Sequence, residues 1–287
     1  MEKTTRGWLN GFIGVIIFAG SLPATRVAVA DLSPLFLSSA RAGIAGVIGL
    51  GLLRLLRQPP PARGDLPALL ITAGGVVAGY PLLTAFALQS MTSAHSMVFL
   101  GLLPLSTALF AVVRGGERPH PAFWLFSLLG AACVAGYSAL GTSAGPSQGD
   151  GLMLAAILVC GLGYAEGAKL SRRLGGWQVI CWALVISLPV MLPIAFFTQP
   201  ASYRAVSAEA WLGLGYVSLF SMLIGFVFWY RGLAQGGIAA VGQLQLFQPF
   251  IGLTLAALLL HEKVSWGMLL VTLAAVVCVS GAKRYAR

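Results

Sequence analysis

The chain has 287 residues, of which 58% are hydrophobic and only 9% are charged, and its formal net charge is +10. A soluble domain carries charge on about a quarter of its residues, so this composition excludes a water-soluble globular protein and indicates one embedded in lipid. The basic excess does not indicate nucleic-acid binding, because the basic residues are spread over many short loops and form no single face.

Apolar runs of about 20 residues recur along the chain, the length that a helix needs to cross a hydrocarbon core of roughly 30 Å. The runs are continuously apolar and do not alternate, which favours helices over a β-barrel. We therefore predict an all-α membrane protein with ten transmembrane helices. In chain order they are expected at 8–29, 35–53, 66–88, 94–113, 123–140, 152–171, 179–197, 210–233, 238–260 and 266–282.

The first apolar run imitates a secretory signal peptide, because it has a charged start and ends in Ala28-Val29-Ala30. Its apolar stretch is too long for a signal peptide, and it carries Arg26 near its end. Removing it would also leave an odd number of helices and break the symmetry described below. We interpret this run as the first membrane helix.

Basic residues concentrate at alternate ends of the predicted helices, which is the bias that orients membrane proteins. This pattern predicts cytoplasmic termini, and we expect the inner membrane of a bacterium. The basic residues that follow the pattern are Lys3, Arg6, Arg54, Arg57, Arg63, Arg114, Arg118, Lys169, Arg172, Arg173, Arg231, Lys283, Arg284 and Arg287.

The cysteines give no sign of a metal or redox site. Cys133, Cys160, Cys181 and Cys278 all lie inside predicted helices and lack CxxC spacing. We therefore expect no disulfide, no metal and no cofactor.

One phrase occurs twice: a proline, small apolar residues, and thirteen residues later a glutamate followed by a basic residue. The two copies are Pro104 to Glu117-Arg118 and Pro249 to Glu262-Lys263. A shift of 145 residues superposes them and predicts two five-helix halves, 1–143 and 144–287. Because five is odd, the second copy must cross the membrane in the opposite sense, and such inverted repeats suit alternating access through a midplane cavity.

Three features together resemble a known family: Gly20-Ser21 in the first helix, Ser39-Ala40-Arg41 in the second, and the doubled proline-to-glutamate phrase. The chain resembles the drug/metabolite transporter superfamily over essentially its whole length. It is most similar there to the ten-helix EamA-type exporters, and among these to the YddG-type exporters of aromatic and other neutral amino acids. The resemblance implies an inverted five-plus-five fold and a central cavity lined mainly by helices one, three, four, six, eight and nine.

Prolines inside the predicted helices indicate hinges, because proline removes a helical hydrogen bond and clashes with the preceding turn. Pro23 follows Gly20-Ser21 in the first helix, and Pro81 follows Tyr80 in the third. The repeat register places Gly225 of the eighth helix opposite Tyr80, so we expect the halves to break in related places by different means. A static kink is the alternative to a gating hinge.

Polar and aromatic side chains inside the spans are candidates for substrate binding. Three glutamines of the ninth helix could hydrogen-bond the amino and carboxyl groups of a zwitterion, although they could equally join neighbouring helices. Aromatic rings could wall a cavity for apolar side chains, with ordinary packing as the alternative. The predicted cavity residues are Gly20, Ser21, Tyr80, Phe99, Tyr164, Trp229, Gln243, Gln245 and Gln248.

Four charged or titratable residues inside the spans also need an interpretation. Glu166 and Lys169 are spaced for a pair on one helical face, and proton coupling by Glu166 is the alternative. His95 is expected at the membrane interface, with a pH role as its alternative. Arg41 matches a basic position of the family, where we favour a role in locking helices over binding a carboxylate.

Rival functions lack their motifs. His261-Glu262 begins like a zinc-binding HExxH, but residue 265 is serine, and neither a nucleophile motif nor a phosphate-binding loop occurs. A channel would need rings of polar residues from several subunits. We therefore predict a monomeric secondary transporter that exports small amphipathic metabolites, above all aromatic and other neutral amino acids. A multidrug or cationic-dye exporter of the same fold is the alternative.

Overall fold

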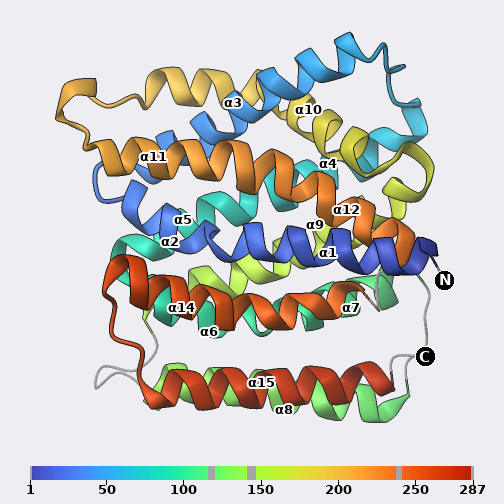
Figure 1. Cartoon of the computed structure of the whole chain (residues 1–287), viewed down its shortest axis with the longest axis vertical. Helices are drawn as coiled ribbons and strands as arrows, with labels where there is room; N and C mark the ends of the chain where they lie inside the picture. Colours follow the sequence, from blue (N-terminus) through green and yellow to red (C-terminus); the bar gives the residue numbers. More distant parts are fainter. Residues whose placement is uncertain (1, 116–119, 141–146, 237–240, 286–287) are drawn as a thin grey trace.

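The computed structural model describes residues 2–115, 120–140, 147–236 and 241–285, and within these ranges it contains helices and no strand. This confirms the all-α prediction. Figure 1 shows the helices running back and forth across one bundle, with the start of α1 and the end of α15 at the same end. Seven of the described segments are long and apolar enough to cross a membrane, and two shorter apolar helices accompany them.

Each predicted span corresponds to one helical segment, and several of these segments consist of shorter pieces. The first half contains α1 (Glu2–Ala19), α2 (Ser21–Ala28), α3 (Pro34–Leu55), η1 (Arg63–Asp65), α4 (Leu66–Thr72), η2 (Ala73–Gly79), α5 (Tyr80–Ser90), α6 (Ser93–Leu100), α7 (Leu103–Gly115) and α8 (Pro121–Leu140). The second contains α9 (Gln148–Leu174), α10 (Gly176–Phe197), η3 (Tyr203–Ala205), α11 (Ala208–Tyr216), η4 (Val217–Ile224), α12 (Gly225–Gly236), η5 (Gln243–Phe247), α14 (Gln248–Leu260) and α15 (Trp266–Arg284). The predicted boundary between the halves, 143/144, lies outside the described residues.

Hydroxyl side chains define the starts of several helices. Ser33 accepts a hydrogen bond from the backbone N–H of Phe36 at 3.2 Å, and Pro34 follows it as the first residue of α3. Ser147 and Asp150 form a reciprocal capping box at the start of α9, with N···O distances of 3.2 and 3.0 Å. These caps satisfy N–H groups that have no partner inside the helix.

Helical geometry breaks shortly before four prolines: Pro23, Pro81, Pro104 and Pro249. Proline cannot donate to the carbonyl four residues earlier, so each of these carbonyls loses its α-helical partner. The carbonyls concerned belong to Ala19, Val77, Leu100 and Gln245. The breaks lie in the first, third, fourth and ninth membrane segments. By contrast, α10 stays α-helical through two internal prolines.

The breaks follow the repeat register. The element η2 is a π-helix over 73–79, and a shift of 145 places it on 218–224, inside the π-helix η4. The break at 101–102 shifts onto 246–247, inside η5. We expected the third and the eighth segments to be interrupted in different ways. This expectation was wrong, because a π-helical turn interrupts both segments. The sequence signal for a π-helical turn is weak, because no single proline or glycine position marks it in both segments.

The packing between the two halves follows the internal repeat. The principal pairs are α3 with α10, α8 with α15, α1 with α12, and α9 with the segment of η2 and α5 (Figure 1). Glycines bring two of these pairs into backbone contact. A Cβ atom on Gly232 would lie 2.6 Å from the backbone N of Gly11, and one on Gly75 would lie 2.9 Å from the Cα of Gly163.

Candidate substrate-binding site

A small cavity lies between the two halves and is lined by residues from both. The side chains leave room in it for about one water molecule, far less than the roughly 300–1,000 Å³ of a typical small-molecule pocket. The lining residues are Phe18, Ser21, Arg41, Val76, Tyr80, Tyr164, Ser221, Phe226 and Gln248. A larger ligand can enter only if these side chains or their helices move.

One wall of the cavity is aromatic. Phe18 of α1 lies against Phe226 of α12, with ring centroids 5.0 Å apart, and stacks on Tyr164 of α9 at 6.5 Å. Tyr164 and Phe226 meet edge to face at 5.8 Å. Trp229 lies behind this wall, with its ring 5.7 Å from that of Tyr164. These rings form an aromatic surface suited to an aromatic or aliphatic side chain.

A second wall is polar and positively charged. Arg41 of α3 is buried, with 2% of its surface exposed, and its Nη2 donates to Ser221 Oγ at 3.3 Å. Ser221 donates in turn to Ser21 Oγ at 3.0 Å, which joins η4 to α2. Arg41 Nε has no hydrogen-bond partner among the described residues.

Of the three glutamines of the ninth segment, Gln248 lines this cavity. It donates from Nε2 to the Phe18 carbonyl at 3.4 Å and leaves its Oε1 without a described partner. Gln245 is buried, and neither of its amide atoms has a partner in the described part of the chain. The side chain of Gln243 lies outside the described part. A buried amide without a partner is unfavourable, so these groups favour a polar ligand.

The other predicted cavity residues are divided between the lining and its surroundings. Ser21, Tyr80 and Tyr164 line the cavity together with Gln248. Gly20 is outside the lining and faces Tyr216, whose hydroxyl would lie 2.5 Å from an added Cβ. Phe99 is buried against His95, away from this cavity, with ring centroids 5.7 Å apart.

The lining departs from the implied helix set in two respects. The described fourth helix, α6 and α7, contributes no lining residue, whereas the second helix contributes Arg41. Sequence reasoning did not place Phe18, Val76, Ser221 or Phe226 in the cavity, and it assigned Arg41 to helix locking. Ser221 and Val76 are twin positions under the shift of 145, so the repeat register links these two lining residues once one of them is known.

The predicted hinge residues lie at the helix breaks that flank the cavity. Pro23 follows the break at Gly20, and Pro81 is the second residue of α5, directly after η2. Gly225 begins α12 directly after η4, and an added Cβ would lie 2.7 Å from the ring of Phe18. Two lining residues, Val76 and Ser221, belong to the π-helices themselves, which is a frequent location for functional residues.

Glu166 pairs with a different residue from the one expected. Its Oε1 accepts a hydrogen bond from Arg114 Nε of α7 at 2.5 Å, and its carboxylate is buried while the arginine is half exposed. The expected pair with Lys169 on the same helix is therefore corrected to a pair between α7 and α9. The i,i+3 spacing allowed the first pair, but the packing of α7 on α9 supplies the second.

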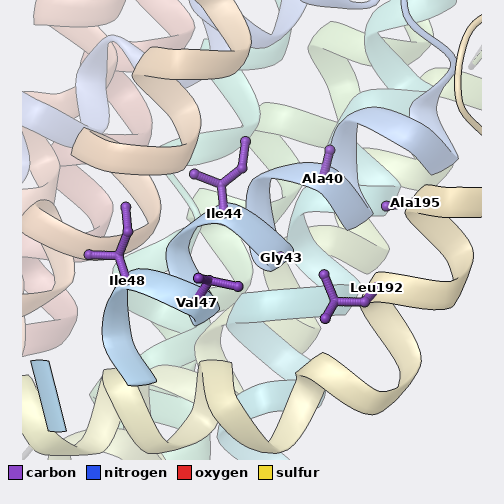
Figure 2. A pocket seen from close by; sticks show the side chains of 7 residues that line it. All are labelled: Ala40, Gly43, Ile44, Val47, Ile48, Leu192 and Ala195. Atoms are coloured by element: carbon purple, nitrogen blue, oxygen red, sulfur yellow. The ribbon is translucent and has the colours of Figure 1, made fainter. Parts of the chain in front are cut away.

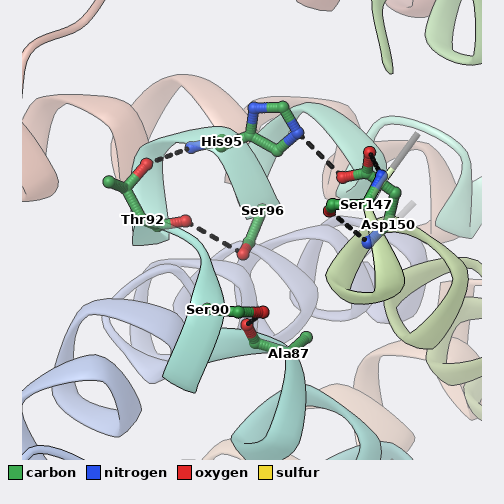
Figure 3. Close-up of polar contacts among 7 residues, drawn as sticks. All are labelled: Ala87, Ser90, Thr92, His95, Ser96, Ser147 and Asp150. Carbon is green, nitrogen blue, oxygen red and sulfur yellow. Dashed lines mark hydrogen bonds and ion pairs between the residues drawn. The ribbon is translucent and has the colours of Figure 1, made fainter. Parts of the chain in front are cut away.

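His95 also has a carboxylate partner. Its Nε2 lies 2.9 Å from Oδ1 of the buried Asp150, which links the start of α6 to the start of α9 (Figure 3). The histidine side chain is 16% exposed and also contacts the ring of Tyr137. The pair therefore connects the two halves of the chain, a role that the expected interfacial position did not include.

A further contact between the halves lies in the loops at the same end. The Asp31 carboxylate accepts hydrogen bonds from the backbone N–H of Ser207, at 2.9 Å, and from its hydroxyl. These bonds lower the pKa of the Asp31 carboxyl below its usual value, because they favour the ionised form. Ser207 in turn caps α11 by accepting from Ala210 N at 3.3 Å. Asp31 thus connects the loop after α2 to the start of α11.

A larger hollow differs from this cavity in its chemistry. It lies between α3 and α10, and Figure 2 shows only hydrocarbon side chains around it. A surface of this kind can contact lipid chains but offers nothing to a carboxylate or an amine. Its lining residues are Ala40, Gly43, Ile44, Val47, Ile48, Leu192 and Ala195.

Comparison with known proteins identifies the family. The sequence profile described as the EamA-like transporter family matches residues 5–139 and again residues 147–282. The chain belongs to the EamA-like transporter family. It is therefore a multi-pass membrane transporter, and the resemblance to the drug/metabolite transporter superfamily is confirmed.

Two curated relatives and one solved structure extend this result. An "Uncharacterized transporter YdeK" of Bacillus subtilis (strain 168) is 64% identical over 287 residues, covering 100% of both chains. A "Probable terminal-alkyne amino-acid exporter" of Streptantibioticus cattleyicolor is 25% identical over 260 residues, covering 86% of this chain and 83% of that protein. A crystal structure with 19% identity and a TM-score of 0.68 covers 97% of this chain and 95% of its own, and shares the fold.

Proposed function

We propose that this EamA-family transporter exports aromatic and other neutral amino acids across the bacterial inner membrane by alternating access. The observation that carries the proposal is the pairing of two unlike walls in one buried cavity. The aromatic wall of Phe18, Tyr164 and Phe226 suits an apolar side chain, and the opposite wall offers hydrogen bonds to polar groups. An amphipathic molecule with a polar end satisfies both walls at once.

The relatives support the same substrate class. The Streptantibioticus protein is named for the export of an amino acid with a terminal alkyne, and it matches most of this chain. Both curated relatives carry the names of transporters, which favours transport over enzymatic activity. Amino acids share their ammonium and carboxylate groups and differ in their side chains. The aromatic wall is therefore the part of this cavity that would distinguish one amino acid from another.

Alternating access is supported by the packing around the cavity. The segments α1–α2 and α11–α12 make close contacts on both sides of it, through Gly11 and Gly232 on one side and Gly213 on the other. A Cβ atom on Gly213 would lie 2.7 Å from the Ala24 carbonyl oxygen. Opening one side while keeping the other closed would expose the cavity to one compartment at a time.

The two halves would exchange conformations in this cycle because they are built alike and inverted. The loop after α3 and the loop after α10 are twin positions, and they lie at opposite ends of the bundle in Figure 1. The start of α1 and the end of α15 share one end, which we assign to the cytoplasm from the basic residues there. Since one chain supplies the cavity lining, we take the monomer as the transporting unit.

Counterflow in proteoliposomes tests the substrate class. Liposomes preloaded with phenylalanine should take up radiolabelled phenylalanine, and external aromatic amino acids should compete strongly while sugars do not. Phe226→Ala should weaken competition by aromatic amino acids more than competition by alanine, because it removes part of the aromatic wall. Strong competition by cationic dyes, with none by any amino acid, would establish the multidrug alternative instead.

A pH gradient tests the coupling candidates. Glu166 and His95 are both paired, which favours structural roles, but either pair could exchange a proton during the cycle. If one of them couples transport to protons, Glu166→Gln or His95→Gln should abolish the stimulation by a pH gradient and preserve counterflow. A wild-type rate that does not change with the gradient would exclude proton coupling by either residue.

A further inference from the structure

The buried cavity holds a permanent positive charge that has no counterion in the described structure. Arg41 is 2% exposed, lines the cavity, and makes one described side-chain hydrogen bond, to a neutral serine. We propose that Arg41 binds the carboxylate of the transported amino acid, and that Gln248 Oε1 accepts a hydrogen bond from its ammonium group. This proposal rests on the proposed function and adds the polar recognition to it.

The described acidic side chains lie elsewhere. No carboxylate within the described ranges reaches the ion-pair distance of 4.0 Å from Arg41. Five of the described carboxylates have a partner of their own, and Glu209 is exposed at the start of α11. The pairs are Asp31 with Ser207, Asp65 with Arg173, Asp150 with His95, Glu166 with Arg114, and Glu262 with Ser93 and Ala94.

An unpaired guanidinium at this depth favours the binding of an anion. Arginine stays protonated in proteins, so it cannot neutralise itself by releasing a proton. Burying a charge without a counter-charge is strongly unfavourable, and a carboxylate ligand would remove much of this cost. A cationic ligand would meet a like charge instead, so Arg41 disfavours cationic dyes in the same cavity.

Arg41 keeps hydrogen-bond donors available for a carboxylate. The bond from Nη2 to Ser221 is long, at 3.3 Å, and Nε is without a described partner. Nε and Nη2 can together donate two parallel hydrogen bonds to one carboxylate, which is the geometry that arginine provides and lysine does not. Ser221, which accepts the bond from Arg41, is itself held in place by its hydrogen bond to Ser21 Oγ at 3.0 Å.

The second polar group completes an amino-acid site. Gln248 is 3% exposed and belongs to α14 of the other half, and its unpartnered Oε1 is an acceptor. A zwitterion held by Arg41 and Gln248 would therefore connect α3 to α14. The side chain of the substrate would then face the rings of Phe18, Tyr164 and Phe226.

Analogues of phenylalanine test each contact separately. The measurement is competition with phenylalanine counterflow, together with ligand-induced thermal stabilisation of the purified protein. In the wild type, phenylalaninamide, which lacks the carboxylate, should compete at least tenfold more weakly than phenylalanine. 3-Phenylpropionate, which lacks the ammonium group, should still stabilise the protein, and phenethylamine should not.

Variants of Arg41 complete the test. Arg41→Gln should bind phenylalanine and phenylalaninamide about equally, because the discriminating charge is gone. Arg41→Lys keeps the positive charge but loses the forked donors, and it should retain part of the preference for phenylalanine over phenylalaninamide. Gln248→Leu should lower the affinity for phenylalanine and leave that for 3-phenylpropionate unchanged. The control is Arg204→Gln, an exposed arginine of η3, which should behave as wild type.

The outcomes separate the two proposals. Equal competition by phenylalanine and its amide in the wild type would overturn the role of Arg41 while leaving amino-acid export intact. Full discrimination retained by Arg41→Gln would do the same. Stabilisation by 3-phenylpropionate that depends on Arg41, without competition from any amino acid, would support the carboxylate contact and reject the proposed substrate class. No effect of amino acids or simple carboxylates on the wild type would reject both.

Discussion

At the scale of single residues, Glu262 shows what the repeated proline-to-glutamate phrase does in its second copy. Its carboxylate accepts hydrogen bonds from the backbone N–H groups of Ser93 and Ala94, at 3.1 and 2.8 Å, and from the Ser93 hydroxyl at 2.8 Å. These donors form the start of α6, where free N–H groups and the helix dipole favour a negative charge. Its twin, Glu117, lies outside the described residues.

Replacing Glu262 should therefore destabilise the protein. Loss of a helix cap costs about 0.5–2 kcal/mol, so we expect Glu262→Ala to lower the thermal midpoint in detergent by several degrees. Tryptophan fluorescence during heating provides the measurement, and Lys263→Ala, at the exposed neighbouring residue, is the matched control. Equal midpoints for the two variants would show that the bonds from α6 to Glu262 contribute nothing to stability.

Asp31, in the loop after α2, should make the stability of the protein depend on pH. Its pKa is lowered in the folded protein by the hydrogen bonds from Ser207, so its stabilising effect is present above the ordinary aspartate pKa of about 3.9 and is lost as the pH falls through the lowered folded value. Asp31→Asn should therefore have a lower thermal midpoint than the wild type near pH 7. The difference should shrink below about pH 4, and a difference independent of pH would contradict this assignment.

Side-chain direction limits what the sequence can reveal at this scale. Ser21, Tyr80, Tyr164 and Gln248 could be selected as cavity candidates because polar and aromatic groups stand out in apolar helices. The direction of Arg41 could not be predicted, because the few polar residues of α3 form no continuous stripe that would orient the helix. Its position depends on the packing of α3 against α10 and η4, which only tertiary structure supplies.

At the scale of elements, the contact between α1 and α12 depends on glycine at facing positions. Gly7 and Gly11 of α1 meet Gly236 and Gly232 of α12, and the backbones approach so closely that a side chain has no room between them. Such contacts let helices pack tightly and shift relative to each other without interlocking side chains. They border the cavity on the side where α1 begins, so they are suited to open and close it.

Gly232→Ala should disrupt this contact selectively. Its methyl group would lie 2.6 Å from the backbone N of Gly11, which forces the two helices apart. We expect counterflow to fall at least tenfold while the protein remains inserted and monodisperse in detergent. Gly215→Ala is the control in the same membrane segment, because nothing lies within 4 Å of its added Cβ. Similar transport by both variants would show that close contact between α1 and α12 is not needed for the cycle.

The helix breaks were only partly predictable from the sequence. Proline lacks the N–H of the helical hydrogen bond, and breaks lie next to Pro23, Pro81, Pro104 and Pro249. The signal is incomplete, because α10 stays α-helical through its two internal prolines. The π-helix η4 contains no proline, and its position emerges only when the repeat register aligns it with η2. An extra residue in a helical turn leaves little trace in composition, so tertiary packing decides whether the turn forms.

At the scale of the whole molecule, the pairing of helices obeys the internal repeat. The first segment packs on the eighth as the sixth packs on the third, and the second and fifth pack on their own twins, the seventh and tenth. With such a symmetric set of contacts, each half would adopt the arrangement of the other with little net change in packing energy in an alternating-access cycle. Two such states of similar free energy are what alternating access requires.

If the two halves are inverted as we propose, twin loops should face opposite compartments. Arg57 and Ser202 are twins under the shift of 145, and both are exposed in loops. In a variant without the four native cysteines, Ser202→Cys should react with a membrane-impermeant maleimide added to intact cells. Arg57→Cys should react only after the cells are permeabilised, and Arg172→Cys, at the end of α9, should behave like it.

This labelling pattern separates an inverted duplication from a parallel one. A parallel arrangement would place twin positions on the same face, and a cavity between parallel halves would not open to opposite sides when the halves exchange conformations. Reaction of Arg57→Cys and Ser202→Cys from the same side of intact cells would thus remove the physical basis for alternating access. It would leave the walls of the cavity unchanged, so substrate binding could still be tested through Arg41 and Gln248.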